Sequence, residues 1–325
     1  MKVLVTGATG FLGSNLCERL QYEGYTVRAL VRNPQKAEQL KKKGFETTIG
    51  DLRDFYSLQR AMNGIDIVFN LAAAWRDNLN KKDLFGTNVT GTENILKAAF
   101  EEGVKRFVHC STVGVHGSVL TAQADENSPF SPKDDYQLSK VEGERIVSGY
   151  AGENKLPIVI FRPSGIYGPG DLRILKLFRA IKKHYFVMLG SGDVLYHMIY
   201  IDDLIEGILL CGKKDKAVGN IYILGSDEFV KLKVLVSIIS NILGVNIPGF
   251  SLPFLPVYYL AKTCEWVFKP LNINPPIYPR RIEFFRSNRA FDISKAKKEL
   301  GFQPKTDLRT GLKKTYEWYE ANGLL

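Results

Sequence analysis

The first half of the chain alternates short apolar runs with segments whose apolar residues recur at helical spacing. The opening run KVLVTG predicts a buried strand, and Leu12, Leu16 and Leu20 then mark one face of a helix that ends at Gly24. Further runs of the strand type are YTVRALVR, FETTIG, DIVFNLAAA, VKRFVHCST and IVIFRP. Helices are predicted over residues 35–43, 84–102 and 134–150.

This alternation predicts a parallel sheet covered by helices on both faces, because parallel strands need crossover connections. The expected fold class is α/β, with a doubly wound (Rossmann) sheet. After about residue 163, Gly and Pro become frequent, and predicted helices such as 202–212 and 231–243 are separated by longer irregular segments. We therefore expect a first domain over residues 1–165 and a smaller C-terminal α/β domain over 166–325, with a strand or helix exchanged across the boundary.

One segment of the second half combines aliphatic and aromatic residues over the length of a helix. FLPVYYLAKTCEWVF, residues 254–268, predicts an amphipathic helix. We expect it to pack against its own domain or an oligomer partner rather than lie on a membrane. The longest apolar run is interrupted by Lys262 before it reaches the length of about 18 residues that a membrane span needs, so we expect no integral membrane segment.

Composition and charge narrow the class of protein. The 325 residues are 45% hydrophobic and 24% charged, as in an ordinary globular protein with a large core. The four cysteines form no CxxC pair and the sequence opens directly on a strand, so we expect a reducing, cytoplasmic location without a signal peptide. The four histidines lack metal-ligand spacing, and we expect no metal site.

The net charge of +10 raises the question of an anionic partner. The basic residues are dispersed over predicted helices, as in KKK, IKKH, KKDK and KAKK, without a basic stripe that is interleaved with aromatic residues. We therefore expect no nucleic acid partner. An anionic cofactor or a small-molecule substrate accounts for the charge more economically.

A glycine-rich turn joins the first strand to the first helix. VTGATGFLG places Gly7, Gly10 and Gly13 where the backbone must turn tightly and approach a pyrophosphate, which a helix N-terminus stabilises. The spacing is GxxGxxG rather than the common GxGxxG, but the strand–turn–helix context is the one that a nucleotide site requires. The turn therefore predicts nucleotide binding.

The end of the second strand indicates which nucleotide binds. An acidic residue there would bond the ribose 2′-hydroxyl of NAD, whereas an arginine accommodates the 2′-phosphate of NADP. The segment ALVRNPQK places Arg32 at this position, with Arg28 and Lys36 nearby and no acid before Glu38. Alternatively, Arg32 only caps an exposed strand end. We expect NADP, with NAD as the alternative.

Tyr136 and Lys140, in DDYQLSKVEGERI, lie one helical turn apart after the fifth strand. That strand ends at Thr112, and ligands bind at the carboxyl ends of strands in open parallel sheets, so we expect the Thr112 hydroxyl to point into a cleft. A second pair with the same spacing, Tyr258 and Lys262, has neither a preceding strand end nor a hydroxyl partner. We interpret that second pair as packing.

A series of motifs runs along nearly the whole chain: TGATGFLG, GDLRD, NLAAA, NVTGT, STVGVHG, YQLSK, RPSGIYGPGD, YIDDLIEG and FDISKAKKELGFQPKTDLRTGL. In this order they resemble the extended short-chain dehydrogenase/reductase superfamily, which contains NAD(P)-dependent epimerases, dehydratases, dihydroflavonol-type reductases and 3β-hydroxysteroid dehydrogenases. The resemblance implies an NAD(P)-binding Rossmann domain over residues 1–165 and a substrate domain over 166–325.

The resemblance also implies that Tyr136 is the catalytic acid or base. A free tyrosine has a pKa near 10 and is a poor base at pH 7, but the Lys140 ammonium and an oxidised nicotinamide ring favour its phenolate. Tyr136 would exchange a proton with the substrate oxygen while hydride moves between nicotinamide and the attached carbon. Thr112 would hydrogen-bond the reacting oxygen, and Lys140 would hold the nicotinamide ribose.

A set of cofactor-binding residues follows from the same resemblance. Asp51 and Leu52 would flank the adenine, Leu71 to Ala73 would line the cofactor, and Pro163 would contact the carboxamide region. The full expected set is Gly7, Thr9, Gly10, Phe11, Leu12, Gly13, Arg32, Lys36, Asp51, Leu52, Leu71, Ala72, Ala73, Asn88, Lys140 and Pro163.

Two departures from the nucleotide-sugar members bear on the reaction. Those members usually have Asn in RPxNxYGP and an Arg seven residues before the second domain's Asp. Here Gly165 takes the first position and Tyr196, counted back from Asp203, takes the second. Other arginines could replace the missing contact, namely Arg173, Arg179, Arg281, Arg286 or Arg289.

We therefore favour the steroid-dehydrogenase and dihydroflavonol-reductase branch, acting on a secondary alcohol or ketone with NADP(H). A nucleotide-sugar epimerase or dehydratase that retains NAD is the alternative, and a non-catalytic nucleotide sensor is a third. Helices such as those over 84–102 and 134–150 commonly pair across a dimer in this superfamily, and we expect a homodimer.

Overall fold

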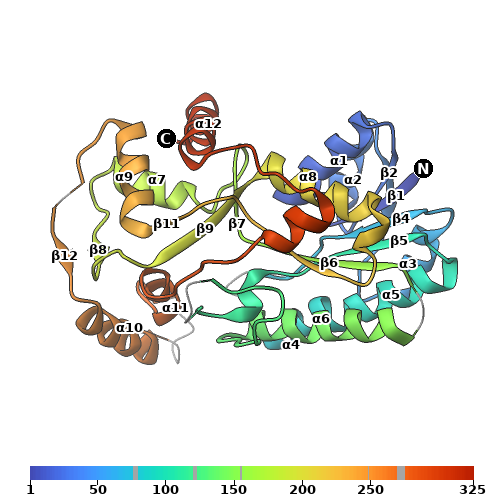
Figure 1. Ribbon diagram of the computed structural model, residues 1–325, viewed down its shortest axis with the longest axis horizontal. Coiled ribbons are helices and arrows are strands. Elements are labelled where there is room, and N and C mark those ends of the chain that lie inside the picture. Colours follow the sequence, from blue (N-terminus) through green and yellow to red (C-terminus); the bar gives the residue numbers. More distant parts are fainter. Residues whose placement is uncertain (76–79, 120–122, 154–155, 248, 269–274) are drawn as a thin grey trace.

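The fold is built on one parallel sheet of seven strands in the order β10-β6-β5-β4-β1-β2-β3 (Figure 1). This is seen in a computed structural model that describes residues 1–75, 80–119, 123–153, 156–247, 249–268 and 275–325. The strand order reverses between β4 and β1, which makes the sheet doubly wound. The strands are β1 Lys2–Thr6, β2 Thr26–Val31, β3 Glu46–Ile49, β4 Ile67–Asn70, β5 Arg106–Cys110, β6 Ile158–Pro163 and β10 Ile221–Leu224.

The apolar runs become the central strands because both faces of the sheet are covered. Val3, Leu4 and Val5 of β1 have no exposed surface, and all residues of β4 and β6 are buried. All six strands that were predicted from apolar runs are present. The seventh, β10, comes from the second half of the chain and pairs with β6 at the edge.

Helices cover the two faces of the sheet in separate layers (Figure 1). One apolar core lies under α1 Phe11–Tyr22, α2 Pro34–Lys42 and α8 Ile201–Lys213. A second lies under α3 Phe55–Met62, α5 Gly91–Glu102 and α6 Asp135–Glu153 on the other face. Helix α8, like β10, follows residue 166 in sequence and nevertheless packs against β5 and β6.

Two helical features differ from the sequence prediction. The segment predicted as one helix over 84–102 is α4 Lys81–Phe85, a π-helical turn η1 Gly86–Thr90, and then α5. The π turn places Asn88 inward, where its side chain is buried and hydrogen-bonded. Helix α3 was not predicted, although Asp54 caps its first turn by accepting from the Ser57 N–H.

The second half adds small sheets and helices beside the carboxyl ends of the main strands (Figure 1). One sheet has the order β11-β9-β7 and another pairs β12 with β8. The strands are β7 Gly165–Tyr167, β8 Met188–Leu189, β9 Leu195–Tyr200, β11 Phe229–Lys231 and β12 Ser251–Leu252. The helices are α7 Leu175–Lys182, α9 Leu232–Leu243, α10 Phe254–Phe268, α11 Pro279–Ile282 and α12 Leu308–Ala321, with short turns η2 Val113–His116, η3 Asp215–Ala217, η5 Glu283–Phe285 and η6 Ala296–Leu300.

Candidate active site

The glycine turn between β1 and α1 is packed so closely that side chains are excluded from it. Gly7 has φ +70°, and a Cβ there would lie 3.0 Å from the Ala72 nitrogen. A Cβ on Gly13 would fall well inside contact distance of the Gly7 carbonyl. Gly10 is the N-cap of α1, and the first N–H groups of a helix have no intrahelical partner. The turn therefore offers backbone donors and a bare surface to an anionic ligand.

A hydrogen-bond network holds the loop after β4 against this turn. The Thr6 hydroxyl donates to Asn70 Oδ1 over 2.8 Å and accepts from the N–H groups of Leu71 (3.0 Å) and Ala72 (2.9 Å). Asn70 Nδ2 also lies 3.2 Å from Nδ1 of buried His109. The sequence reasoning missed Thr6, Asn70 and His109, which place the residues expected to line a cofactor.

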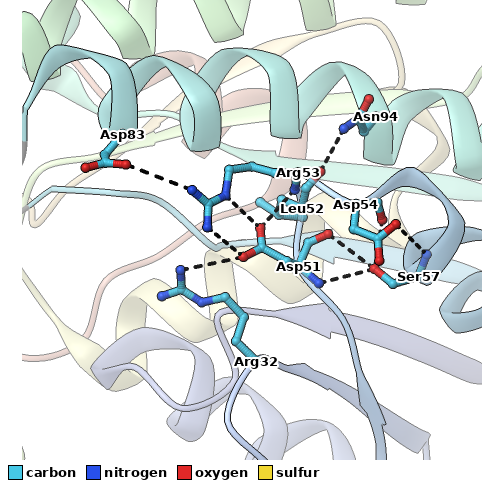
Figure 2. Close-up of polar contacts among 8 residues, drawn as sticks. All are labelled: Arg32, Asp51, Leu52, Arg53, Asp54, Ser57, Asp83 and Asn94. Carbon is cyan, nitrogen blue, oxygen red and sulfur yellow. Dashed lines mark hydrogen bonds and ion pairs between the residues drawn. The ribbon is translucent and has the colours of Figure 1, made fainter.

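Two arginines flank the carboxylate of Asp51 (Figure 2). Arg53 donates to both Asp51 oxygens, over 3.2 and 3.1 Å, and Arg32 Nη1 lies 4.0 Å from Oδ2. Burial raises the pKa of Asp51, but the hydrogen bonds from Arg53 and the charges of both arginines outweigh it, so the pKa is lowered. The Arg32 side chain remains 71% exposed at the end of β2 and is available to an anionic group.

The other charged residues near Arg32 differ in their surroundings. Arg28 bonds Glu46 and donates to the carbonyls of Ala61 and Asn63, so its guanidinium is already engaged in contacts at the edge of the sheet. The backbone N–H of Lys36 lies in the first turn of α2, within reach of the Asn33 cap at 3.3 Å, and its side chain is exposed.

Helix α6 carries the predicted catalytic pair past the end of β5. Lys140 is 3% exposed and its Nζ donates to the Cys110 carbonyl over 2.7 Å. Tyr136 is half-buried one turn earlier on the same face. The Thr112 hydroxyl accepts from the Gly114 N–H over 3.0 Å at the start of η2. The tertiary structure thus places Lys140 against the strand end that leads to Thr112.

The charge of Lys140 is set by competing effects. Burial lowers its pKa below the ordinary value of 10.5, while the Cys110 thiol and the Glu144 carboxylate act in the opposite direction. A lysine of this kind can pass between charged and neutral forms more readily than an exposed one.

Asn88 joins the helices on this side of the sheet to the loop after β4. Its Oδ1 accepts from the Ala74 N–H over 2.8 Å, and its Nδ2 donates to the Ala74 carbonyl and the Ser139 hydroxyl, each over 2.9 Å. Ser139 directly precedes Lys140 on α6. Asn88 therefore has a structural part in placing α6, made possible by the π turn in which it lies.

A buried ion pair lies beneath the catalytic candidates and was missed by the sequence reasoning. Glu144 and Arg162 are each 1% exposed and form a two-pronged salt bridge. Ser111 donates to the same carboxylate, and Arg162 Nη1 lies 3.0 Å from His116 Nε2. The spacing in the sequence could have indicated Glu144, because it follows Lys140 by four residues and so lies on the same face of the helix.

The ends of β6 and β9 complete the surroundings. Pro163 is buried at the end of β6, and the next hydroxyl, Ser164 Oγ, is buried without a hydrogen-bond partner among the described residues. In β9, the Tyr196 hydroxyl donates to the Phe284 carbonyl and accepts from Arg289 Nη1, both over 2.6 Å. Arg289 thus contacts Tyr196, the residue that takes the place of the arginine in the nucleotide-sugar pattern.

These observations fit a dinucleotide. The glycine turn forms a cradle that a Cβ would fill, Arg32 supplies an exposed cation, and the Ser164 hydroxyl, which has no hydrogen-bond partner among the described residues, offers a polar contact. Thr9 is exposed in the turn, Phe11 and Leu12 are half-buried beside it, and Leu52 is buried behind Asp51. Ala73 is half-buried after Ala72.

Comparison with known proteins matches this chain to a family. A family described as "NAD dependent epimerase/dehydratase family" matches residues 3–225. The chain is 31% identical to 3beta-hydroxysteroid-dehydrogenase/decarboxylase isoform 1 of Arabidopsis thaliana, over 97% of this chain and 78% of that protein. It is 31% identical to a putative dihydroflavonol 4-reductase of a Synechocystis strain, over 98% and 94%.

A solved structure is similar over the whole length. The UDP-glucuronic acid 4-epimerase of Bacillus cereus, in complex with UDP-glucuronic acid and NAD, superposes with a TM-score of 0.78 at 25% identity. The match covers 99% of this chain and 100% of that one.

Proposed function

Because the chain belongs to the NAD-dependent epimerase/dehydratase family, within the extended short-chain dehydrogenase/reductase superfamily of enzymes, we propose that it transfers hydride between NADP(H) and a secondary alcohol or ketone. The observation that carries the proposal is the buried Lys140, one helical turn from Tyr136 and bonded to the end of β5. A bound nicotinamide supplies the hydride acceptor or donor.

The protein's own residues handle the proton and the orientation. Tyr136 exchanges a proton with the substrate oxygen, the positive charge of Lys140 favours the phenolate, and Thr112 hydrogen-bonds the same oxygen. Lys140 also holds the nicotinamide ribose. The turn of Gly7, Thr9, Gly10, Phe11, Leu12 and Gly13 would hold the pyrophosphate, and Arg32, Lys36, Asp51, Leu52, Leu71, Ala72, Ala73 and Pro163 would supply the remaining contacts. Asn88, expected from the sequence to bind the cofactor, uses its side chain to bond Ala74 and Ser139 and would support the site from behind.

NADP is proposed over NAD because of the charge at the end of β2. Arg32 is exposed there, and no acid occupies the position that would bond a ribose 2′-hydroxyl. The reductase branch is favoured by Gly165 and Tyr196 in place of the nucleotide-sugar Asn and Arg, and by relatives named as a steroid dehydrogenase and a dihydroflavonol reductase.

Replacement of Tyr136 with Phe tests the mechanism. We expect kcat to fall by about 10²- to 10⁴-fold, because general acid–base catalysis is lost, while the Kd for NADPH stays within about twofold. Turnover would be followed as NADPH oxidation with steroid and flavonoid ketones. Tyr258→Phe, in the second Tyr–Lys pair, is the control and should leave kcat unchanged; a Tyr136→Phe enzyme with full activity would refute the mechanism.

The alternative reaction, nucleotide-sugar epimerisation or dehydration with retained NAD, has one specific observation in its favour. Arg289 bonds Tyr196, the residue at the position of the usual diphosphate-binding arginine, so its guanidinium lies beside that position. Mass spectrometry of the nucleotide released by acid denaturation distinguishes the two. Stoichiometric NAD would support the alternative, whereas protein that is purified empty and binds NADPH reversibly would support the reductase.

We also propose a cytoplasmic homodimer that pairs through α5 and α6. Phe100 of α5 is 44% exposed and contacts the Tyr150 ring of α6, so this side carries apolar surface. The described chain holds Cys17, Cys110, Cys211 and Cys264 as free thiols, as a reducing compartment would allow. No helix among the described residues is both long and apolar enough to cross a membrane.

A further inference from the structure

Helix α10 exposes apolar side chains on its outer side. Leu255, Tyr259, Leu260, Trp266 and Val267 are between 44% and 79% exposed, and their spacing puts them on one face of the helix, here called the α10 face. Lys262 is the only charged residue among the eight exposed residues of α10. The prediction of an amphipathic helix therefore needs correction, because α10 is apolar on the outside as well.

The inner side of α10 is already packed. Phe254, Val257 and Tyr258 form a small core with Leu189 and Ile282. The helix lies at the outer edge of the second half of the chain, beside α11 (Figure 1). The α10 face thus has no apolar neighbour within the described chain that would hide it. An apolar face of this size marks an interaction surface.

Charge indicates which partner covers the face. From residue 249 to 290 the sequence has six Lys or Arg and only two acidic residues, Glu265 and Glu283. Two copies of this segment that met face to face would bring like charges together. An anionic surface with an apolar interior complements both features, and exposed Trp266 and Tyr259 are residue types that favour the interface between water and lipid.

The sequence led us to expect packing rather than membrane contact, and the inner side of α10 does pack; for the exposed α10 face we propose instead that it binds the surface of a bilayer that contains anionic lipids. The helix lies in the plane of the membrane, with the apolar side chains below the headgroups and exposed Lys262 among them. Its 15 residues are too few to cross a bilayer, which needs about 20. The inference stands independently of the reaction proposed above.

Vesicle co-sedimentation tests the proposal with the full-length protein. We expect binding to vesicles of phosphatidylcholine with phosphatidylglycerol that exceeds binding to phosphatidylcholine alone by about tenfold and weakens with salt. Tyr259→Glu combined with Trp266→Glu should abolish binding. Tyr56→Glu, at a tyrosine of α3 that is 72% exposed, is the control and should bind as the parent protein does.

Two further readouts make the test decisive. In a variant with Trp75→Phe and Trp318→Phe, only Trp266 remains, and its fluorescence should shift to the blue with anionic vesicles. Light scattering in the absence of lipid should give the same mass for the parent and the Tyr259→Glu/Trp266→Glu variant. Absence of vesicle binding would refute the proposal, and a mass that falls in that variant would show that a second copy covers the face instead.

Discussion

Single residues at the site are held by contacts that burial makes strong. Glu144 and Arg162 have almost no exposure, so each charge depends on the other and on Ser111 and His116 for its hydrogen bonds. Ser111 directly precedes Thr112, and Glu144 follows Lys140 on the same helical face. The ion pair therefore positions both sides of the proposed catalytic centre.

Removing one partner of this pair should be costly. We expect Arg162→Met to lower the free energy of unfolding by about 3–5 kcal/mol, because an unpaired carboxylate stays buried. Glu144→Leu combined with Arg162→Met should be less destabilised than Arg162→Met alone. Urea unfolding measures both, and Arg145→Met, which breaks an exposed pair with Glu142 on the same helix, should cost under about 1 kcal/mol. Equal losses from Arg162→Met and Arg145→Met would contradict this account.

The choice of nucleotide is also argued at a single residue. Arg32→Glu should weaken NADPH binding by about 10- to 100-fold and NADH binding far less, because only NADPH has a 2′-phosphate for the guanidinium to bond. Isothermal titration with each nucleotide measures the ratio. Arg60→Glu, an exposed arginine on α3, changes the net charge equally and should not alter the ratio. If Arg32→Glu weakened the binding of NADPH and NADH equally, the proposed preference for NADP would be refuted.

At the scale of elements, α6 and the π turn η1 pack closely against each other. Gly143 of α6 lies against the backbone of Asn88, so that a Cβ at this position would fall well inside contact distance of the Asn88 carbonyl. Asn88 in turn bonds Ser139, next to Lys140. The π turn and the glycine together set how deeply α6, and with it Lys140, sits against the sheet.

Two glycines on α6 provide a matched comparison. Gly143→Ala should destabilise the protein by about 1–3 kcal/mol, because the backbone of η1 must move. Gly149→Ala should stabilise it by about 0.5–1 kcal/mol, because a Cβ there meets nothing within 4 Å and alanine is the better helix former. Thermal unfolding measures both. A stabilising Gly143→Ala would show that the approach of α6 to η1 is not tight.

On the scale of the whole molecule, β10 and α8 tie the second half of the chain to the main sheet.

Buried histidines lie in three separate places, His109 in β5, His116 in η2 and His197 in β9. Burial lowers the pKa of each below 6.5, and nearby Lys140 and Arg162 lower those of His109 and His116 further.

Acid should therefore destabilise the fold. The unfolded chain binds protons at these histidines near pH 6.5 and the folded chain does not, so stability present above that pH is lost as the pH falls towards the folded-state pKa values. Each histidine adds a slope of up to about 1.4 kcal/mol per pH unit. Urea unfolding between about pH 7 and pH 5 measures it. His197→Gln should reduce the dependence of the unfolding free energy on pH, and His184→Asn, at an exposed histidine, should not. Identical slopes in the two variants would contradict the role of the buried histidines in acid destabilisation.

Local pattern was sufficient for the doubly wound sheet and for recognising the glycine turn, whereas most of the candidate site residues came from the resemblance to the superfamily and stay predictions. Strands buried on both faces must be apolar throughout, and a glycine turn before a helix is recognisable from spacing alone. The pairing of β10 with β6 could not be predicted from the sequence, since nothing in the run IYIL specifies a partner 58 or more residues earlier in the chain. The predicted roles of Tyr136, Lys140 and Thr112, and the division at residue 165, stay predictions.

By itself the sequence determined the fold class, because this depends on side-chain period and local backbone chemistry, and the ordered motifs determined the family by resemblance. Only the tertiary structure decided which charges meet and which surfaces stay exposed. Glu144 pairs with Arg162 and Arg28 with Glu46 because the strands and helices that carry them become neighbours. For the same reason the outer side of α10 is apolar and uncovered, since burial is a property of the packed chain and not of the residue.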